Sequence, residues 1–197
     1  MSADITLRAA TTRDAPAMVL LVDIAGHGLP LHFWTTAVRR GEAVSALEVG
    51  YMRALREEAD FSWKKATIAE LDGEVAGMLT GYLLPARAPV VDLGKLDPVV
   101  RPLVELEALA PSTWYVNVLA AFARFRRLGV GTALIGRAGE IARAVNARGV
   151  SLIVEDTNEA ARRLYEDRGF REVARRPFHA FDGAPEVYDW ILMVRPL

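Results

Sequence analysis

Apolar positions in the first third of the chain predict a strand followed by helices. Residues 5–8 alternate between apolar and polar, as in a short strand. The stretch 11–14 provides an N-cap signal for a helix that runs through Ile24. From Phe33 to Ala59, apolar residues recur at helical spacing, with a break near Gly41. We therefore expect one strand and two or three helices in this part of the chain.

The pattern then changes to that of a hairpin. In ATIAELDGEVAGMLTGYL, two alternating runs flank Asp72-Gly73, a dipeptide typical of tight hairpin turns. The chain is Pro-rich at both ends of the next segment, and DPVVRPLVELEALA inside it has a helical pattern. We treat residues 85–112 as an insertion whose structure and role the pattern does not define.

The second half of the chain alternates strands and helices more regularly. The predicted elements are a strand over Thr113–Ala121, a helix from about Gly131 to Asn146 with Leu134, Ala138, Ile141 and Val145 on its apolar face, a strand in VSLIVE, a helix in NEAARRLYEDR ending at Gly169, and strands over about Phe170–Arg176 and Val187–Val194. This order favours parallel pairing in this half and an α/β fold.

Composition excludes several classes of protein. With 197 residues, 52% hydrophobic and 25% charged, the chain is long enough for one substantial core, so we expect a single domain over residues 1–197. A net charge of -1 argues against attraction to nucleic acid or an anionic membrane. The absence of cysteine excludes a disulfide scaffold and thiolate chemistry, and three scattered histidines lack the spacing of a metal site.

The first residues do not resemble a targeting segment. MSADITLRAATTRDAP has no basic start followed by an apolar run, and no stretch reaches the ~20 apolar residues that span a bilayer. We therefore expect a cytoplasmic protein with no membrane association.

The stretch FRRLGVGTAL joins a predicted strand to a predicted helix. A helix N-terminus carries unpartnered N–H groups and a partial positive charge, so glycines there let an anion approach closely. Arg126 and Arg127 add positive charge. Alternatively, Gly129 and Gly131 only permit a tight turn and the arginines are solvated.

A dinucleotide-binding oxidoreductase is a remote alternative for the same stretch. Its fingerprint needs a third glycine or alanine where this chain has Leu134, and its glycine turn follows the strand directly. Here residues 122–128 intervene, so the required context is missing.

Two motifs resemble the GNAT N-acetyltransferase family. Arg126-Arg127-Leu128-Gly129-Val130-Gly131 matches its pyrophosphate signature Q/R-x-x-G-x-G/A, and NEAARRLYEDRGF matches N-x-x-A-x-x-x-Y followed by Gly-Phe. Element order resembles the family over the whole chain, and sequence likeness is sharpest from Tyr115 to Val173. The chain departs from the commonest pattern at Arg127, where glycine is usual, and at Ala123, where proline is usual.

The resemblance implies a fold and a cofactor site. The fold is a mixed, mostly antiparallel central sheet of about seven strands, with helices on both faces and a parallel-strand splay that holds the cofactor. The cofactor is acetyl-CoA or another acyl-CoA, with no metal. The residues implied to bind it are Leu119, Ala120, Ala121, Arg126, Arg127, Leu128, Gly129, Val130, Gly131, Thr132, Asn158 and Tyr165. For Asn158, an N-cap of the following helix is an equally good interpretation.

The resemblance also implies that Tyr165 is a general acid that protonates the departing thiolate. A purely structural Tyr165 in the core is the alternative. The general base is open: the strand 113–121 carries no acid, which leaves Glu155 or Glu107, with a water chain as another route.

The acceptor site is indicated only by the segment between the first two helices and by one strand residue. We expect His27, Leu29 and Trp34 to line it, together with Asn117; Trp34 is alternatively a core residue. The predicted function is an acyl-CoA-dependent N-acyltransferase acting by direct attack of a primary amine, with a small molecule or amino-acid derivative favoured over protein. A non-catalytic acyl-CoA sensor is the alternative, and a homodimer is left open.

Overall fold

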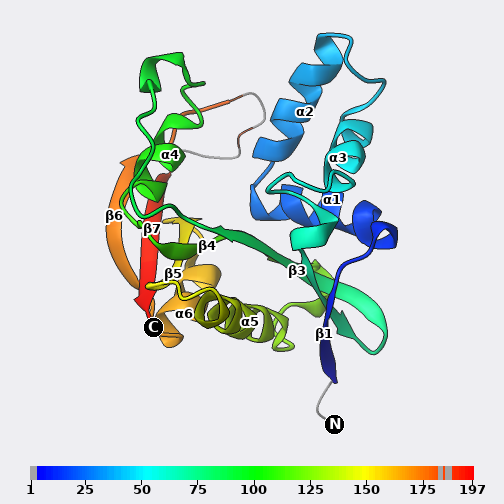
Figure 1. The fold of residues 1–197 in the computed structure, drawn as a ribbon. Coiled ribbons are helices and arrows are strands. Elements are labelled where there is room, and N and C mark those ends of the chain that lie inside the picture. Colours follow the sequence, from blue (N-terminus) through cyan, green and yellow to red (C-terminus); the bar gives the residue numbers. More distant parts are fainter. Residues whose placement is uncertain (1–3, 182–183, 185–187) are drawn as a thin grey trace. The chain divides into compact units, whose positions relative to one another are not determined.

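In the computed structural model, residues 4–181, 184 and 188–197 are described (Figure 1). The helices are α1 (Ala15–Ala25), α2 (Leu29–Arg39), α3 (Ala46–Ala54), α4 (Arg101–Glu107), α5 (Val130–Ala144) and α6 (Glu159–Asp167). The strands are β1 (Ile5–Ala9), β2 (Thr67–Leu71), β3 (Glu74–Leu83), β4 (Thr113–Ala121), β5 (Gly149–Glu155), β6 (Arg171–Pro177) and β7 (Asp189–Pro196). Short 3₁₀ turns lie at η1 (Thr12–Asp14), η2 (Trp63–Lys65), η3 (Leu93–Lys95) and η4 (Ala123–Phe125).

Over the described residues, the strands form one seven-stranded sheet in the order β1-β2-β3-β4-β5-β7-β6. This confirms the predicted mixed α/β fold. The chain divides into two compact units, and β3, β4 and α5 each contribute residues to both. Unit 1 takes in the described residues of Met1–Gly81, Val118–Gly136 and Phe181–Pro185, and unit 2 takes in the described residues of the remainder.

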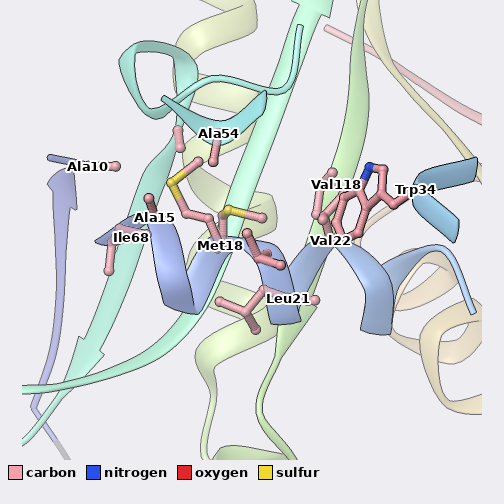
Figure 2. Packing of buried hydrophobic residues seen from close by; sticks show 13 residues of the cluster. Ala10, Ala15, Met18, Leu21, Val22, Trp34, Ala54, Ile68 and Val118 are labelled. Carbon is pink, nitrogen blue, oxygen red and sulfur yellow. The ribbon is translucent and has the colours of Figure 1, made fainter. Parts of the chain in front are cut away.

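Unit 1 buries the apolar face of α1 against β2, β3 and the end of β4 (Figure 2). Met18, Leu21 and Ile68 are completely buried in this cluster, and Trp34 of α2 joins it at 2% exposure. Burying an aliphatic or aromatic side chain of this size stabilises the fold by about 1.5–3 kcal/mol. The predicted strand, the helix through Ile24 and the break near Gly41 between α2 and α3 are confirmed. The predicted N-cap does not act on α1 directly, because Asp14 makes no side-chain cap hydrogen bond there and Thr11 caps the preceding turn η1.

Two local features fix the start of unit 1. Asp72 and Gly73 take positive φ values of 52° and 80°, which a two-residue turn between β2 and β3 requires, so the predicted hairpin is confirmed. Arg8 donates to Asp14 and to Glu70 at 2.8 Å each, which joins β1, the turn before α1 and β2. The guanidinium of Arg8 holds the pKa of the 5%-exposed Asp14 carboxyl below its ordinary value.

Parallel pairing in the second half is restricted to β4 and β5. Their register runs from Thr113↔Gly149 to Val116↔Leu152. β7 lies between β5 and β6 and is antiparallel to both, so the expectation of general parallel pairing in this half was too broad. The reason is that the chain after β6 returns and inserts β7 beside β5, where a helix-linked parallel strand would otherwise pair.

In unit 2, the insertion contains a shorter helix than the sequence predicts. The pattern over 97–110 indicated a helix, and α4 covers Arg101–Glu107 and contacts β6 and β7. The side chain of Glu105 accepts a hydrogen bond from Arg176 of β6 at 2.6 Å. This ion pair ties the insertion to the sheet of unit 2.

Two further findings concern helices. The predicted apolar face of α5 is correct at Leu134 and Ala138, which are completely buried, and wrong at Val145, which is 42% exposed because α5 ends at Ala144. Among the described residues, no single helix is both long and apolar enough to cross a membrane; α1 with its preceding turn and α2 pass that test only as a pair, bent by 113°.

Candidate active site

The loop before α5 contains two residues with a left-handed backbone. Arg126 has a φ of −66°, and Arg127 and Gly129 have positive φ values of 64° and 91°. Arg126 itself is extended, with a ψ of 151°. Arg127 adopts the left-handed backbone that glycine adopts easily. A Cβ on Gly129 would lie 3.3 Å from Cδ1 of Ile5, and its φ disfavours any side chain.

Charge and hydrogen-bond geometry at the start of α5 fit a pyrophosphate. The N–H of Ala133 donates to the carbonyl of Gly129 at 3.0 Å, so Val130 and Gly131 lie in the first turn, whose N–H groups have no acceptor within the helix. In the part of the chain that the structure describes, neither Arg126 nor Arg127 forms an ion pair. The loop before α5 therefore carries the positive charge of two guanidinium groups next to a helix N-terminus.

β4 leaves the parallel ladder before it reaches this loop. The register with β5 ends at Val116, although β4 continues to Ala121. Beyond that point Asn117 is exposed, and Leu119 and Ala121 are only half-buried. A Cβ at Gly77 of β3 would lie 2.6 Å from the carbonyl oxygen of Ala120, so glycine allows the close approach of β3 on the other side. The backbone over 119–121 therefore lies beyond the parallel ladder with β5.

In unit 2, Glu155 and Tyr165 form a buried acid pair. Glu155 ends β5 at 3% exposure, and Tyr165 of α6 is 7% exposed with its ring 5.8 Å from that of Phe170. Burial, and secondly the negative charge of Glu155, raise the pKa of the Tyr165 phenol. The phenol therefore stays protonated at neutral pH, as a general acid must.

Asn158 caps α6. Its side-chain oxygen accepts a hydrogen bond from the N–H of Ala161 at 3.2 Å, which confirms the capping interpretation. This bond occupies the side-chain oxygen, so the side-chain NH₂ is the group that would contact the cofactor. The cofactor contact itself stays a prediction.

Glu107, the other candidate base, belongs to a different cluster of unit 2. The hydroxyl of Tyr82 donates to Oε2 of Glu107 at 3.1 Å, and the ring of Tyr82 lies 5.4 Å from that of Tyr115. Burial chiefly, then the charge of Glu107, raise the pKa of Tyr115 well above its ordinary value. Glu107 therefore accepts a hydrogen bond from a tyrosine hydroxyl and lies in the insertion of residues 85–112.

The predicted acceptor residues occupy unlike environments. Trp34 packs in the core, where a Cβ on Gly50 would lie 2.6 Å from its ring, so packing accounts for it better than substrate contact. Leu29 is also buried, whereas Asn117 is exposed on β4. His27 takes a left-handed φ of 47° at the turn before α2. The ring of His32 lies 5.0 Å from that of Phe181.

Sequence reasoning missed the aromatic residues beside Glu155. Tyr188 and Trp190 are 6% and 5% exposed, and Trp190 is the cross-strand partner of Glu155. The signal was present in the alternation of YDW, where two large polar-tipped rings share one face of a strand. Over the described residues, no group of three or more histidine, aspartate or glutamate side chains is arranged to hold a metal ion.

Comparisons with known proteins agree with this geometry. The model of the acetyltransferase (GNAT) family matches residues 33–170. An N-alpha-acetyltransferase of Sulfurisphaera tokodaii is 33% identical over 131 residues, which is 66% of this chain and 68% of that protein. The solved structure of an acetyltransferase has a TM-score of 0.66 at 22% identity and covers 97% of this chain and 98% of its own. A ribosomal-protein-alanine N-acetyltransferase from Brucella melitensis has a TM-score of 0.60 at 19% identity, covering 98% and 99%.

Proposed function

Since the chain belongs to the acetyltransferase (GNAT) family and is an N-acetyltransferase that uses acetyl-CoA, we propose that it acetylates the primary amine of a small molecule or amino-acid derivative by direct attack. Membership of this family sets aside both the dinucleotide-binding oxidoreductase and the non-catalytic sensor. The cytoplasm, where acetyl-CoA is available, is the proposed location.

The proposed cofactor contacts come mainly from the backbone. The N–H groups of residues 127–132 hold the pyrophosphate at the start of α5, supported by the left-handed backbone of Arg127 and Gly129 and by the helix N-terminus that begins at Val130. The backbone of residues 119–121 pairs with the pantetheine arm as an added strand does, supported by the end of the β4–β5 ladder at Val116.

The observation that carries the catalytic proposal is that Glu155 at the end of β5 and Tyr165 of α6 are both buried, at 3% and 7% exposure, in the same unit. The amine nitrogen attacks the acetyl carbonyl carbon, Glu155 takes the proton from that nitrogen, the C–S bond breaks, and Tyr165 gives its proton to the sulfur. An ordinary phenol with a pKa of ~10 is a weak acid for a thiolate whose thiol has a pKa of ~8.5, so the position of Tyr165 has to compensate.

Electrostatic coupling between the two groups also supplies a reason for the order of these proton transfers. The negative charge of Glu155 raises the pKa of Tyr165. Once Glu155 has taken the amine proton, that charge is gone and Tyr165 becomes a stronger acid as the thiolate leaves. The proton on Glu155 then passes back to Tyr165, and both groups regain their starting states.

Glu155 is favoured over Glu107 because it shares this environment with the proposed acid. The matched test compares Glu155→Gln with Glu107→Gln. Thiol release from acetyl-CoA is measured over a panel of primary amines. We expect wild type to release thiol only with amine present, Glu155→Gln to lose at least about 100-fold in kcat, and Glu107→Gln to lose far less. No turnover on any amine, protein N-terminus or lysine peptide would refute the proposed activity.

A further inference from the structure

A second tyrosine belongs to the buried cluster around Glu155, and the mechanism above does not use it. Tyr188, which precedes β7, stacks on Phe178 at 4.2 Å between ring centroids and meets Trp190 edge-on at 5.0 Å. After the larger effect of burial, the Glu155 carboxylate raises the pKa of Tyr188 as it does that of Tyr165. One carboxylate therefore lies within electrostatic reach of two phenols.

Two hydrogen-bond donors of this cluster are buried without an acceptor. Within residues 4–181, 184 and 188–197, neither the hydroxyl of Tyr188 nor the indole N–H of Trp190 has a hydrogen-bond partner. A buried polar group left in this state destabilises the fold and is rare in folded proteins. Two such donors on side chains in contact call for a reason other than packing.

The register of the sheet brings both donors to the face on which Glu155 stands. Trp190 is paired directly with Glu155 across the antiparallel β5–β7 ladder, and cross-strand partners project to the same side. The ring contact with Trp190 adds Tyr188 to this group. A carboxylate and two donors are thus collected at one end of β5, entirely within unit 2.

We propose that Tyr188 and Trp190 form an acceptor subsite that binds an oxygen of the substrate and so places its amine at Glu155. The inference rests on the proposed function. Two donors fit the two lone pairs of one carbonyl oxygen or the two oxygens of one carboxylate. The substrate class is therefore an amine with a carbonyl or carboxylate on the neighbouring carbon. The ε-amine of lysine has a methylene group there and leaves both donors unpaired.

Burial of the two donors makes the subsite selective. Tyr188, Trp190 and Glu155 are 6%, 5% and 3% exposed, so a substrate oxygen bound there would be shielded from water. A site whose buried polar groups stay unpaired with the wrong ligand rejects that ligand more strongly than an apolar pocket does.

Calorimetric titration of the full chain with alaninamide, alanine, trialanine and ethylamine tests the subsite directly. Ethylamine is alaninamide without its carboxamide group. We expect alaninamide to bind at least about tenfold more tightly than ethylamine, and Tyr188→Phe to remove most of that difference. Tighter binding of alanine indicates a carboxylate, and tighter binding of trialanine indicates the first carbonyl of a peptide.

A stability measurement separates this role from a structural one. Tyr188→Phe removes an unpaired hydroxyl, so its melting temperature should equal or exceed that of wild type. The control Tyr51→Phe, on the exposed side of α3, should change neither melting temperature nor ligand preference. Equal affinities for alaninamide and ethylamine, or a preference that survives in Tyr188→Phe, overturns the inference. Absence of turnover on every amine, with the binding preference intact, overturns only the proposed function.

Discussion

At the scale of single residues, catalysis is proposed to depend on one hydroxyl. Tyr165→Phe keeps the ring that packs on Phe170 and removes only the proton, so we expect kcat to fall about 10²- to 10⁴-fold while acetyl-CoA affinity stays the same. The test is kcat for thiol release with an accepted amine, measured under conditions where the chemical step limits the rate. If Tyr165 is only a core residue, Tyr165→Phe keeps full turnover while Tyr165→Ala loses about 3–5 kcal/mol of stability.

A second prediction at this scale concerns Arg127 and its left-handed backbone. Arg127→Gly keeps the same loop path, because glycine adopts the φ of 64° without strain. The relief of strain is offset by the greater freedom of glycine in the unfolded chain, so the melting temperature should move by less than about 2 °C. Calorimetry should show a modest loss of acetyl-CoA affinity that shrinks with salt. A loss that does not depend on salt would mean that the loop itself had changed.

At the scale of elements, the N-terminus of α5 and the cap of α6 carry the cofactor prediction. Gly129→Asp puts a side chain and a negative charge at the turn, so we expect acetyl-CoA binding to be lost. Gly136→Asp adds the same charge to the same helix at a position with nothing within 4 Å, and it should bind nearly as wild type does. Unchanged affinity in a folded Gly129→Asp variant would contradict the proposed pyrophosphate site.

The cap of α6 allows its two interpretations to be separated. Asn158→Asp keeps an oxygen for the N–H of Ala161 and loses the side-chain NH₂. We expect thermal stability to hold and acetyl-CoA affinity to fall several-fold, whereas Asn158→Ala should lose about 1 kcal/mol of stability as well. Equal cofactor affinity in wild type and Asn158→Asp would leave Asn158 with a capping role only.

At the scale of the whole molecule, buried phenols set a limit in alkali. Burial raises the pKa of Tyr115, Tyr165 and Tyr188 above the ordinary value of 10.0. A phenol whose pKa is higher in the folded than in the unfolded chain stabilises the fold, and this stabilisation is complete below pH 10. It is lost as the pH rises above 10. The urea concentration at the unfolding midpoint should therefore decrease as the pH is raised beyond about 10. Phenolate absorbance from these residues should appear only when the protein unfolds. Phenolate formation in the folded protein would contradict this.

Local patterns were sufficient to predict most of the helices and strands and the loop before α5, whereas long-range strand pairing was not predictable from them. The strand Thr113–Ala121, the turn at Asp72-Gly73 and the loop before α5 depend on nearby residues, so the sequence alone predicts them. The place of β7 and the contact of Tyr188 with Trp190 depend on segments far apart in the chain. For Trp34 the pattern left both a substrate site and the core open, because it cannot tell a buried ring from an exposed one.

The position of β7 has a consequence for synthesis on the ribosome. Both β5 and β6 are synthesised before Asp189–Pro196, yet each pairs with that strand in the folded sheet. Until it arrives, their unpaired edges are templates for the wrong partner, and the local contacts of α6 cannot compensate. Nascent chains that stall before β7 should therefore depend on chaperones, and the pairing that brings Trp190 opposite Glu155 should be among the last steps of folding.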